Sequence, residues 1–251
     1  LMCTFTQSVK SLTFFFFFIR SLLASTDDSI PRFDQLFSFC CVENNFDVIA
    51  LSETHLEASI DEDEILFTGY SVFRHDRNRH GGGVLLYVRT DLNPVQLSVL
   101  SRTGIECVYV KVQTLSSWCI FAVYYRPPNQ TSVEINTFLD EMGHQFNILE
   151  KSFPKFPKIL LGDFNDRCQD WTKSHVNSEL KNNLFNLLNS YNFSQLINKP
   201  TRGINILDLL ITDKPELIFN IKIEDPLDNL DHTSIRASLA LTHLKPQNYK
   251  R

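Results

Sequence analysis

A carboxylate and a carboxamide stand two residues apart at the point where an apolar run of the sequence ends. The run at 159–162 (Ile-Leu-Leu-Gly) leads into Asp163 and, after one phenylalanine, Asn165. This pattern is typical of a buried strand whose last turn faces water or a ligand. Since side chains alternate along an extended chain, Asp163 and Asn165 are expected on the same side of it. Both could then address one phosphate, one metal ion or one water, although an ordinary polar turn has the same pattern.

Further polar residues stand at the ends of other predicted strands. These candidates are Glu53, Tyr125, Thr201, Asp208, Asp231 and His232. Ligand sites of α/β folds gather at strand ends, because loops converge there above a rigid sheet. Several carboxylates with one histidine and one tyrosine, without a cysteine ligand or a glycine-rich phosphate loop, suit Mg²⁺ and a phosphoester.

The candidates also have purely structural interpretations. Glu53 could be a solvated turn carboxylate, Tyr125 a strand-end aromatic and His232 a surface histidine. Asp208 differs, because it stands among leucines and isoleucine, where a buried carboxylate requires a partner. The remaining histidines are interpreted as surface residues: His55, His75, His80, His144, His175 and His243.

A basic segment precedes three consecutive glycines. Residues 74–80 contain two histidines and three arginines, Arg74, Arg77 and Arg79. The segment could be a solvated loop, or it could contact the phosphate backbone of a DNA duplex. The glycines at 81–83 resemble a phosphate cradle, but a strand follows them and no helix does, which favours a hairpin connection.

The elements that must position these residues alternate along 251 residues without a linker or an internal repeat, which favours one α/β domain. Helices are expected at about 30–46, 133–149 and 179–191, the second capped by Thr131 and Ser132. Strands are expected at 14–18, 47–51, 84–88, 107–112, 118–125, 159–163, 195–198, 207–212, 219–223 and 234–241. Two sheets with helices outside them would bury the apolar strands on both faces, giving an α/β sandwich.

The composition excludes two classes of protein. With 43% apolar residues and 21 phenylalanines the chain buries a substantial core, which excludes a disordered chain. A net charge of −5 argues against a protein that binds polyanions through bulk charge, although a local basic face remains compatible with it. Six cysteines without a CxxC or Cys/His spacing indicate core thiols.

The amino terminus is unusual, because five consecutive phenylalanines occupy 14–18. Arg20 interrupts this apolar segment after a few residues, which disfavours a signal peptide, and the segment is about half as long as a membrane span. We expect a non-native or disordered leader at 1–13, a single domain at 14–243 and a tail at 244–251.

Six short motifs occur in a defined order. They are Ser-Glu-Thr-His-Leu (52–56), Gly-Gly-Gly-Val-Leu-Leu-Tyr-Val (81–88), Tyr-Tyr-Arg-Pro-Pro (124–128), Leu-Leu-Gly-Asp-Phe-Asn (160–165), Ile-Leu-Asp-Leu-Leu-Ile-Thr (206–212) and Leu-Asp-His-Thr-Ser-Ile (230–235). The series resembles the endonuclease/exonuclease/phosphatase superfamily over about residues 18–241. The third and fifth motifs are similar to those of the endonuclease domain that precedes the reverse transcriptase in non-long-terminal-repeat retrotransposons. The resemblance implies a DNase-like, four-layered α/β sandwich of two mixed sheets flanked by helices.

The resemblance also implies a Mg²⁺-dependent phosphodiesterase, with Mn²⁺ as an alternative ion, that nicks double-stranded DNA. Glu53 would be the main metal ligand, and Asp231 would lie beside the metal. Asp163 would position or deprotonate the attacking water, and Asn165 would hold that water or the phosphate. His232 would contact the scissile phosphate; whether Asp163 or His232 is the base stays open at this point.

The same resemblance assigns supporting roles. Asp208 would hydrogen-bond the other ring nitrogen of His232, and Tyr125 would donate its hydroxyl to a phosphate oxygen. Thr201 would contact the DNA. In a full-length element a reverse transcriptase domain would follow, and the active protein would be intracellular and nuclear. No contact with a membrane is expected.

Phe18 departs from the family pattern. Relatives carry an asparagine at this position, where it helps to hold phosphate and metal, so the resemblance implies an intact fold with weakened activity. Two other functions stay open: a phosphatase or lipid phosphodiesterase on the same scaffold, and a catalytically decayed remnant that only binds nucleic acid.

Overall fold

The computed structural model describes residues 11–25, 30–100, 104–115, 117–171, 178–226 and 230–241. In spatial order, the first sheet contains β11 (Ile218–Glu224), β12 (Ser234–Ala240), β1 (Ser11–Phe18), β2 (Val48–Ser52), β4 (Val84–Arg89) and β3 (Tyr70–His75). The second contains β5 (Val95–Gln96), β6 (Glu106–Gln113), β7 (Trp118–Tyr125), β8 (Lys158–Asp163), β10 (Asp208–Thr212) and β9 (Ser194–Gln195).

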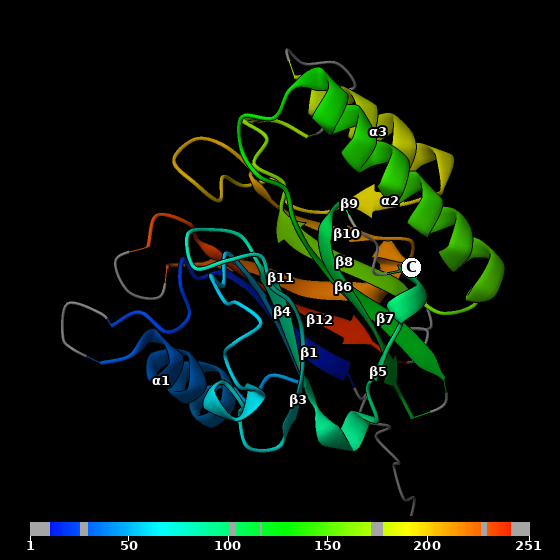
Figure 1. Ribbon diagram of the computed structural model, residues 1–251. Coiled ribbons are helices and arrows are strands. Elements are labelled where there is room, and N and C mark those ends of the chain that lie inside the picture. Colours follow the sequence, from blue (N-terminus) through cyan, green and yellow to red (C-terminus); the bar gives the residue numbers. More distant parts are fainter. Residues whose placement is uncertain are drawn as a thin grey trace, which may run out of the picture.

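The two six-stranded sheets lie face to face and are flanked by helices (Figure 1). Both are mixed, because β1 pairs with β2 and β7 with β8 in parallel, whereas the other neighbours are antiparallel. The predicted α/β sandwich of two mixed sheets is therefore confirmed.

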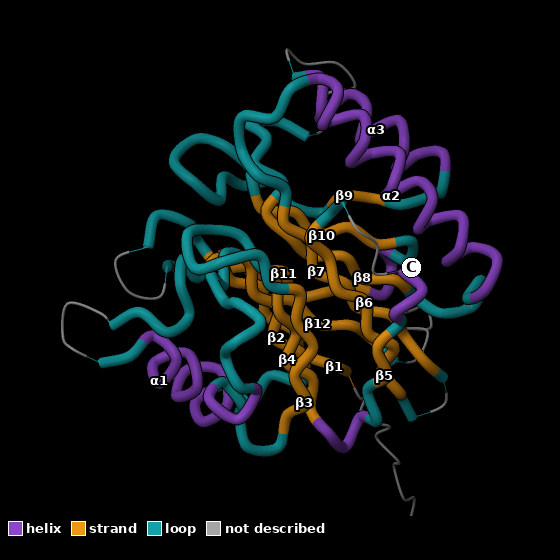
Figure 2. Tube along the Cα trace, viewed as in Figure 1, coloured by secondary structure: helices purple, strands orange, loops and turns teal. Residues whose placement is uncertain are grey.

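The outer faces of the sheets are covered by helices, as Figure 2 shows. The α-helices are α1 (Arg32–Phe37), α2 (Ser132–Ser152) and α3 (Glu179–Ser190). Helix α2 begins as predicted, because the Thr131 hydroxyl accepts from the amide of Glu134 while the Glu134 carboxylate accepts from Thr131. The α-helix expected at 30–46 is shorter than predicted, because α1 ends at Phe37. A π-helical segment follows it at Ser38–Glu43.

The phenylalanine run forms β1, which lies between β12 and β2 and is buried on both faces. Alternation sends Phe14 and Phe16 toward the second sheet, where Phe14 meets the ring of Phe121 at 5.4 Å. Phe15 and Phe17 instead join the cluster that packs under α1. A strand with two buried faces has no polar positions, which explains the uninterrupted run.

The boundaries of the chain differ in part from those expected. Strand β1 begins at Ser11, so residues 11–13 belong to the sheet and not to a leader. The rest of that leader and the tail at 244–251 lie outside the described residues. Strand β3 was not predicted, and the glycines at 81–83 belong to the connection from β3 to β4, as expected of a hairpin. None of the helices in the described part of the chain is long and apolar enough to cross a membrane.

Strand register brings the candidates to one edge of the sandwich. In the second sheet Tyr125 is paired with Asp163 across β7 and β8, and Asp163 with Asp208 across β8 and β10. Glu106 extends this row, because it pairs with Tyr125 across β6 and β7. Four polar side chains therefore stand at one level of the sheet.

Candidate active site

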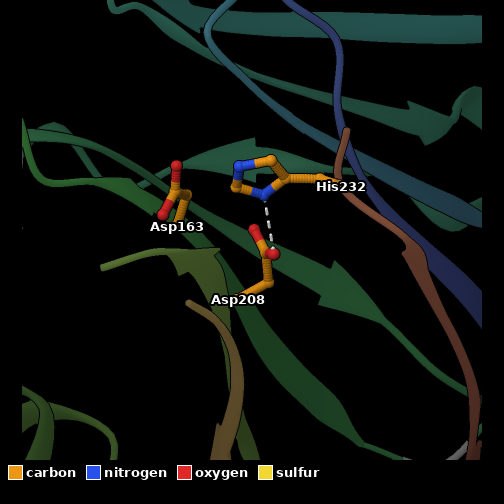
Figure 3. A group of neighbouring side chains, drawn as sticks. All are labelled: Asp163, Asp208 and His232. Atoms are coloured by element: carbon orange, nitrogen blue, oxygen red, sulfur yellow. Dashed lines mark hydrogen bonds and ion pairs between the residues drawn. The ribbon is translucent and has the colours of Figure 1, made fainter. Parts of the chain in front are cut away.

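Asp208 and His232 form a buried ion pair that joins the two sheets. Asp208 begins β10 of the second sheet, and His232 lies two residues before β12 of the first. His232 Nδ1 lies 2.9 Å from Asp208 Oδ2, and both side chains are fully buried (Figure 3). Because a carboxylate only accepts, Nδ1 carries the proton, and Nε2 is the nitrogen left to act on a ligand.

Thr201 fixes the backbone next to both residues of this pair. Its hydroxyl accepts hydrogen bonds from the amides of Leu207 and Asp208 at 3.0 and 3.1 Å. Its carbonyl accepts from the amide of Thr233 at 2.8 Å, next to His232. Thr201 is fully buried, so it positions the pair and the structure does not present it as the predicted DNA contact.

Asp163 and Asn165 lie together, as predicted, but through a turn. Asn165 has a positive φ of 49°, so the chain is not extended there. Its backbone amide and its side-chain amide donate to the two Asp163 carboxylate oxygens at 2.9 and 3.0 Å. The buried Arg126 holds this turn by donating to the carbonyls of Phe164 at 2.5 Å and Asn165 at 2.8 Å. No role had been predicted for Arg126.

Glu53 follows β2 directly and adopts a positive φ of 60°. Its Oε2 accepts from the amide of Gly82 at 3.4 Å and lies 2.5 Å from His55 Nε2. The hydroxyl of Tyr125 is a further hydrogen-bond partner. The prediction that His55 is a surface residue is therefore wrong: its side chain is 14% exposed and pairs with Glu53.

The buried carboxylate of Asp163 is electrostatically strained. Burial and the neighbouring Asp208 raise its pKa well above the usual value, although His232 opposes this. For His232, burial acts to lower the pKa, but Asp208 and Asp163 outweigh it and the net shift is upward. Glu53 behaves in the opposite way: burial is overcome by hydrogen bonds from Tyr125 and His55, so its pKa is lowered. One site thus holds a strongly basic carboxylate and a readily ionised one.

The donor set fits a hard divalent cation. Ligand atoms of Asp163, Asp208 and His232 all lie within 4.8 Å of one another. Among the described residues, Asp208 Oδ1 and His232 Nε2 are buried without a hydrogen-bond partner, which is costly unless a ligand satisfies them. Carboxylate oxygens with one imidazole and no thiolate suit Mg²⁺ or Mn²⁺.

Phe18 closes this cluster on the side of the first sheet. Its ring stacks on the His232 imidazole with centroids 3.9 Å apart and an interplanar angle of 8°. The side chain is 5% exposed and stands opposite Ser52 at the end of β1. The expected orientation of Phe18 toward the site is therefore observed.

Asp231 is not brought into the cluster, although it was expected beside the metal. Its carboxylate is 42% exposed and pairs with Arg202 Nη2 at 2.6 Å and Arg20 Nη2 at 3.5 Å.

The basic segment is also not a uniform loop. Arg74 belongs to β3 and donates to the Ile60 carbonyl, and Arg77 pairs with Glu106 at 3.0 Å. Arg79 alone of the three is mostly exposed, at 64%.

Arg77 and Glu106 instead contact residues beside the candidate site, Tyr125 and Gly83. The Arg77 guanidinium lies 5.5 Å from the Tyr125 ring centroid, and Glu106 accepts from the amide of Gly83 at 2.5 Å. Neither role was predicted, because the pairing of β6 with β7 places Glu106 beside Tyr125 from a position 19 residues earlier in the chain.

We expect Asp208→Asn to lower the pKa of His232. Asp208 contributes most to raising the pKa against burial, ahead of Asp163, so an uncharged partner removes most of the stabilisation of the imidazolium. In the parent, the raised pKa contributes stability at low pH that is lost as pH rises through the folded-state value. An NMR titration of the imidazole signals measures the shift, and an unchanged pKa would contradict this account of the pair.

The chain matches known proteins at two levels, a protein family and several solved structures. A family model described as Endonuclease/Exonuclease/phosphatase family matches residues 18–228, so the chain belongs to that family of phosphoester hydrolases. No curated protein matches the sequence. The fold is similar to that of the endonuclease domain of TRAS1, a telomere-specific non-LTR retrotransposon, at 17% identity and a TM-score of 0.70, covering 92% of this chain and 99% of that one.

Two further solved structures, an AP endonuclease and a 3′ phosphatase, have a similar fold. AP endonuclease LMAP from Leishmania major has 12% identity and a TM-score of 0.70, covering 92% of this chain and 88% of that one. The 3′ phosphatase NExo from Neisseria, bound to a product DNA hairpin, has 12% identity and a TM-score of 0.64, covering 91% and 99%. At these identities the likeness establishes the fold.

Proposed function

We propose that this chain is a metal-dependent DNA endonuclease that nicks a duplex and leaves a 3′-hydroxyl for target-primed reverse transcription. The observation that carries the proposal is the buried cluster of Asp163, Asp208 and His232, whose unsatisfied Oδ1 and Nε2 atoms require a ligand. The family membership and the fold shared with a retrotransposon endonuclease domain support a nucleic acid as that ligand.

In the proposed reaction, water attacks phosphorus in line with the P–O3′ bond; that bond breaks, the 3′ oxygen takes up a proton, and the products are a 5′-phosphate and a 3′-hydroxyl. Asp163 is suited to take the proton, because burial beside Asp208 makes its carboxylate unusually basic. Asn165 holds that carboxylate in place through two hydrogen bonds. Asp208 holds the Nδ1 proton of His232 and raises the pKa of the imidazole, so the protonated ring would donate from Nε2 to a phosphoryl oxygen.

Glu53, with its lowered pKa, and the cluster carboxylates would hold Mg²⁺ or Mn²⁺. When bound, such an ion stabilises the negative charge that builds on phosphorus and on the leaving oxygen. Tyr125 donates its hydroxyl to Glu53, and once an ion takes that carboxylate the hydroxyl would be free to donate to a phosphate oxygen. Action on chromosomal DNA would place the active protein in the nucleus, with a reverse transcriptase domain following in a full-length element.

The phosphatase alternative keeps a specific basis, because a 3′ phosphatase has the same fold. We therefore propose one comparison: supercoiled plasmid, a duplex with a 3′-phosphate, inositol phosphates and sphingomyelin, each with Mg²⁺ and with EDTA. The expected result is nicking of the plasmid that requires the metal. Turnover of the small phosphoesters or of the lipid without nicking would assign the site to the alternative class.

A further inference from the structure

Two arginines from distant parts of the chain meet on one aspartate at the rim of the site. Arg20 follows β1, and Arg202 lies in the connection that precedes β10. Their guanidinium nitrogens lie 3.5 and 2.6 Å from the two carboxylate oxygens of Asp231, next to His232. Three charged side chains that no catalytic step uses therefore stand beside the catalytic pair.

The backbone on each side of this group is fixed. Around Arg20, the amides of Ser21 and Leu22 donate to the carbonyls of Glu53 and Thr54 at 2.8 and 3.0 Å. Arg20 itself has a positive φ of 39°, which the neighbouring strand must hold in place. The Arg20 guanidinium also lies 5.7 Å from the Phe18 ring centroid.

The backbone of Arg202 is also fixed by hydrogen bonds. Its amide donates to the Asn205 carbonyl at 3.1 Å, and the Asn205 amide donates back to Arg202 at 2.9 Å, which closes a tight turn. The turn begins at Thr201, whose carbonyl receives the amide of Thr233. The turn that carries Arg202 is thus hydrogen-bonded to the segment that carries His232.

The charges of the group leave it positive and open to solvent. Two guanidinium groups share one carboxylate, and the side chains of Arg20 and Arg202 are 52% and 41% exposed. An arginine fork has five donors, and among the described residues the printed contact of each side chain to a carboxylate is the one to Asp231, which leaves donors for an anion such as a phosphate.

We propose that Arg20 and Arg202 clamp a backbone phosphate of the nucleic acid next to the scissile one, and that Asp231 holds the clamp open. This inference rests on the proposed function and names the contact that positions its substrate. Asp231 lies between the two guanidinium groups and spaces them. Ion pairs of this exposure stabilise the fold little, which leaves the group available for binding.

The test uses the full chain with Arg20→Ser and Arg202→Ser combined, and a 20-base-pair duplex in EDTA. We expect binding to weaken on the order of tenfold, and the slope of log affinity against log salt to become shallower by about one, because the clamp contacts one phosphate. The matched control is Lys151→Ser with Lys155→Ser, which removes the same charge from two exposed lysines before β8, at the opposite edge of the sandwich. The control should bind like the parent.

Equal affinity and salt slope in the arginine and lysine variants would overturn the clamp, as would a parent that binds no duplex in EDTA. Asp231→Asn gives a second readout: the amide keeps the size and one acceptor oxygen of the spacer but not its negative charge, so metal-free binding should be at least as tight as in the parent. Loss of that binding in Asp231→Asn would also contradict the clamp. Since these measurements need no cleavage, a parent that binds through the arginines but never nicks with Mg²⁺ would refute the proposed function alone.

Discussion

Replacing Glu53 or Asp163 by alanine is expected to reduce plasmid nicking on the order of a hundredfold or more while the protein stays folded. The lowered pKa of Glu53 favours the ionised form that an ion needs, and the pKa of the buried Asp163 is raised well above its usual value, which suits a base. Each variant therefore removes a group whose contribution grows as charge builds on phosphorus. The measurement is the initial rate of conversion of supercoiled plasmid into open circles with saturating DNA and Mg²⁺.

Folding can be separated from chemistry in these variants. Removing Asp163 relieves its repulsion with Asp208, so Asp163→Asn should retain the parental melting temperature or exceed it. A control substitution, Asp91→Ala, removes an exposed carboxylate at the far end of β4 and should leave nicking unchanged. Nicking at close to the parental rate in Glu53→Ala or Asp163→Ala would refute the assigned roles.

Phe18→Asn is expected to accelerate nicking by as much as about a hundredfold. The ring now stacks on His232, where it can neither donate to a phosphoryl oxygen nor ligate a metal ion. An amide at the same place restores a preorganised donor, and one such donor contributes roughly 3 kcal/mol to a transition state. The gain should appear in kcat more than in the affinity for DNA, because the contact strengthens as the charge develops.

Phe18→Leu is the matched comparison, since it removes the aromatic stack without supplying a donor. We expect its rate to stay at or below that of the parent. An equal acceleration in Phe18→Leu would mean that release of the imidazole, and not a new donor, limits the rate. No acceleration in Phe18→Asn, with Glu53→Ala still inactive, would contradict the role given to this position.

The architecture was predictable because the buried strands are uninterrupted apolar runs of the sequence. Apolar runs such as 159–161 and 209–211 have no polar interruption, which requires layers on both faces. Asp163, Asp208 and His232 were predictable for a related reason. Each is a polar residue placed directly beside a buried strand, and such groups survive only with partners.

The contacts between distant segments could not be predicted in the same way. Arg126, Glu106 and His55 act through pairings set by strand register and by loop geometry, which local patterns do not encode. The basic segment was expected to be a loop, but Arg74 completes a strand whose buried positions alternate too weakly to recognise. Asp231 was placed by motif alone, and its two arginine partners come from positions 29 and 211 residues away.

The chemistry of the DNA ends that the protein leaves on supercoiled plasmid tests the proposed function most directly. The purified chain is incubated with plasmid in Mg²⁺ or EDTA, and the open circles are offered to a DNA polymerase with labelled nucleotides. The account predicts nicks that form only with the metal and that the polymerase extends without prior phosphatase treatment, because the product carries a 3′-hydroxyl. Nicks that form in EDTA, or that become extendable only after removal of a 3′-phosphate, would contradict it.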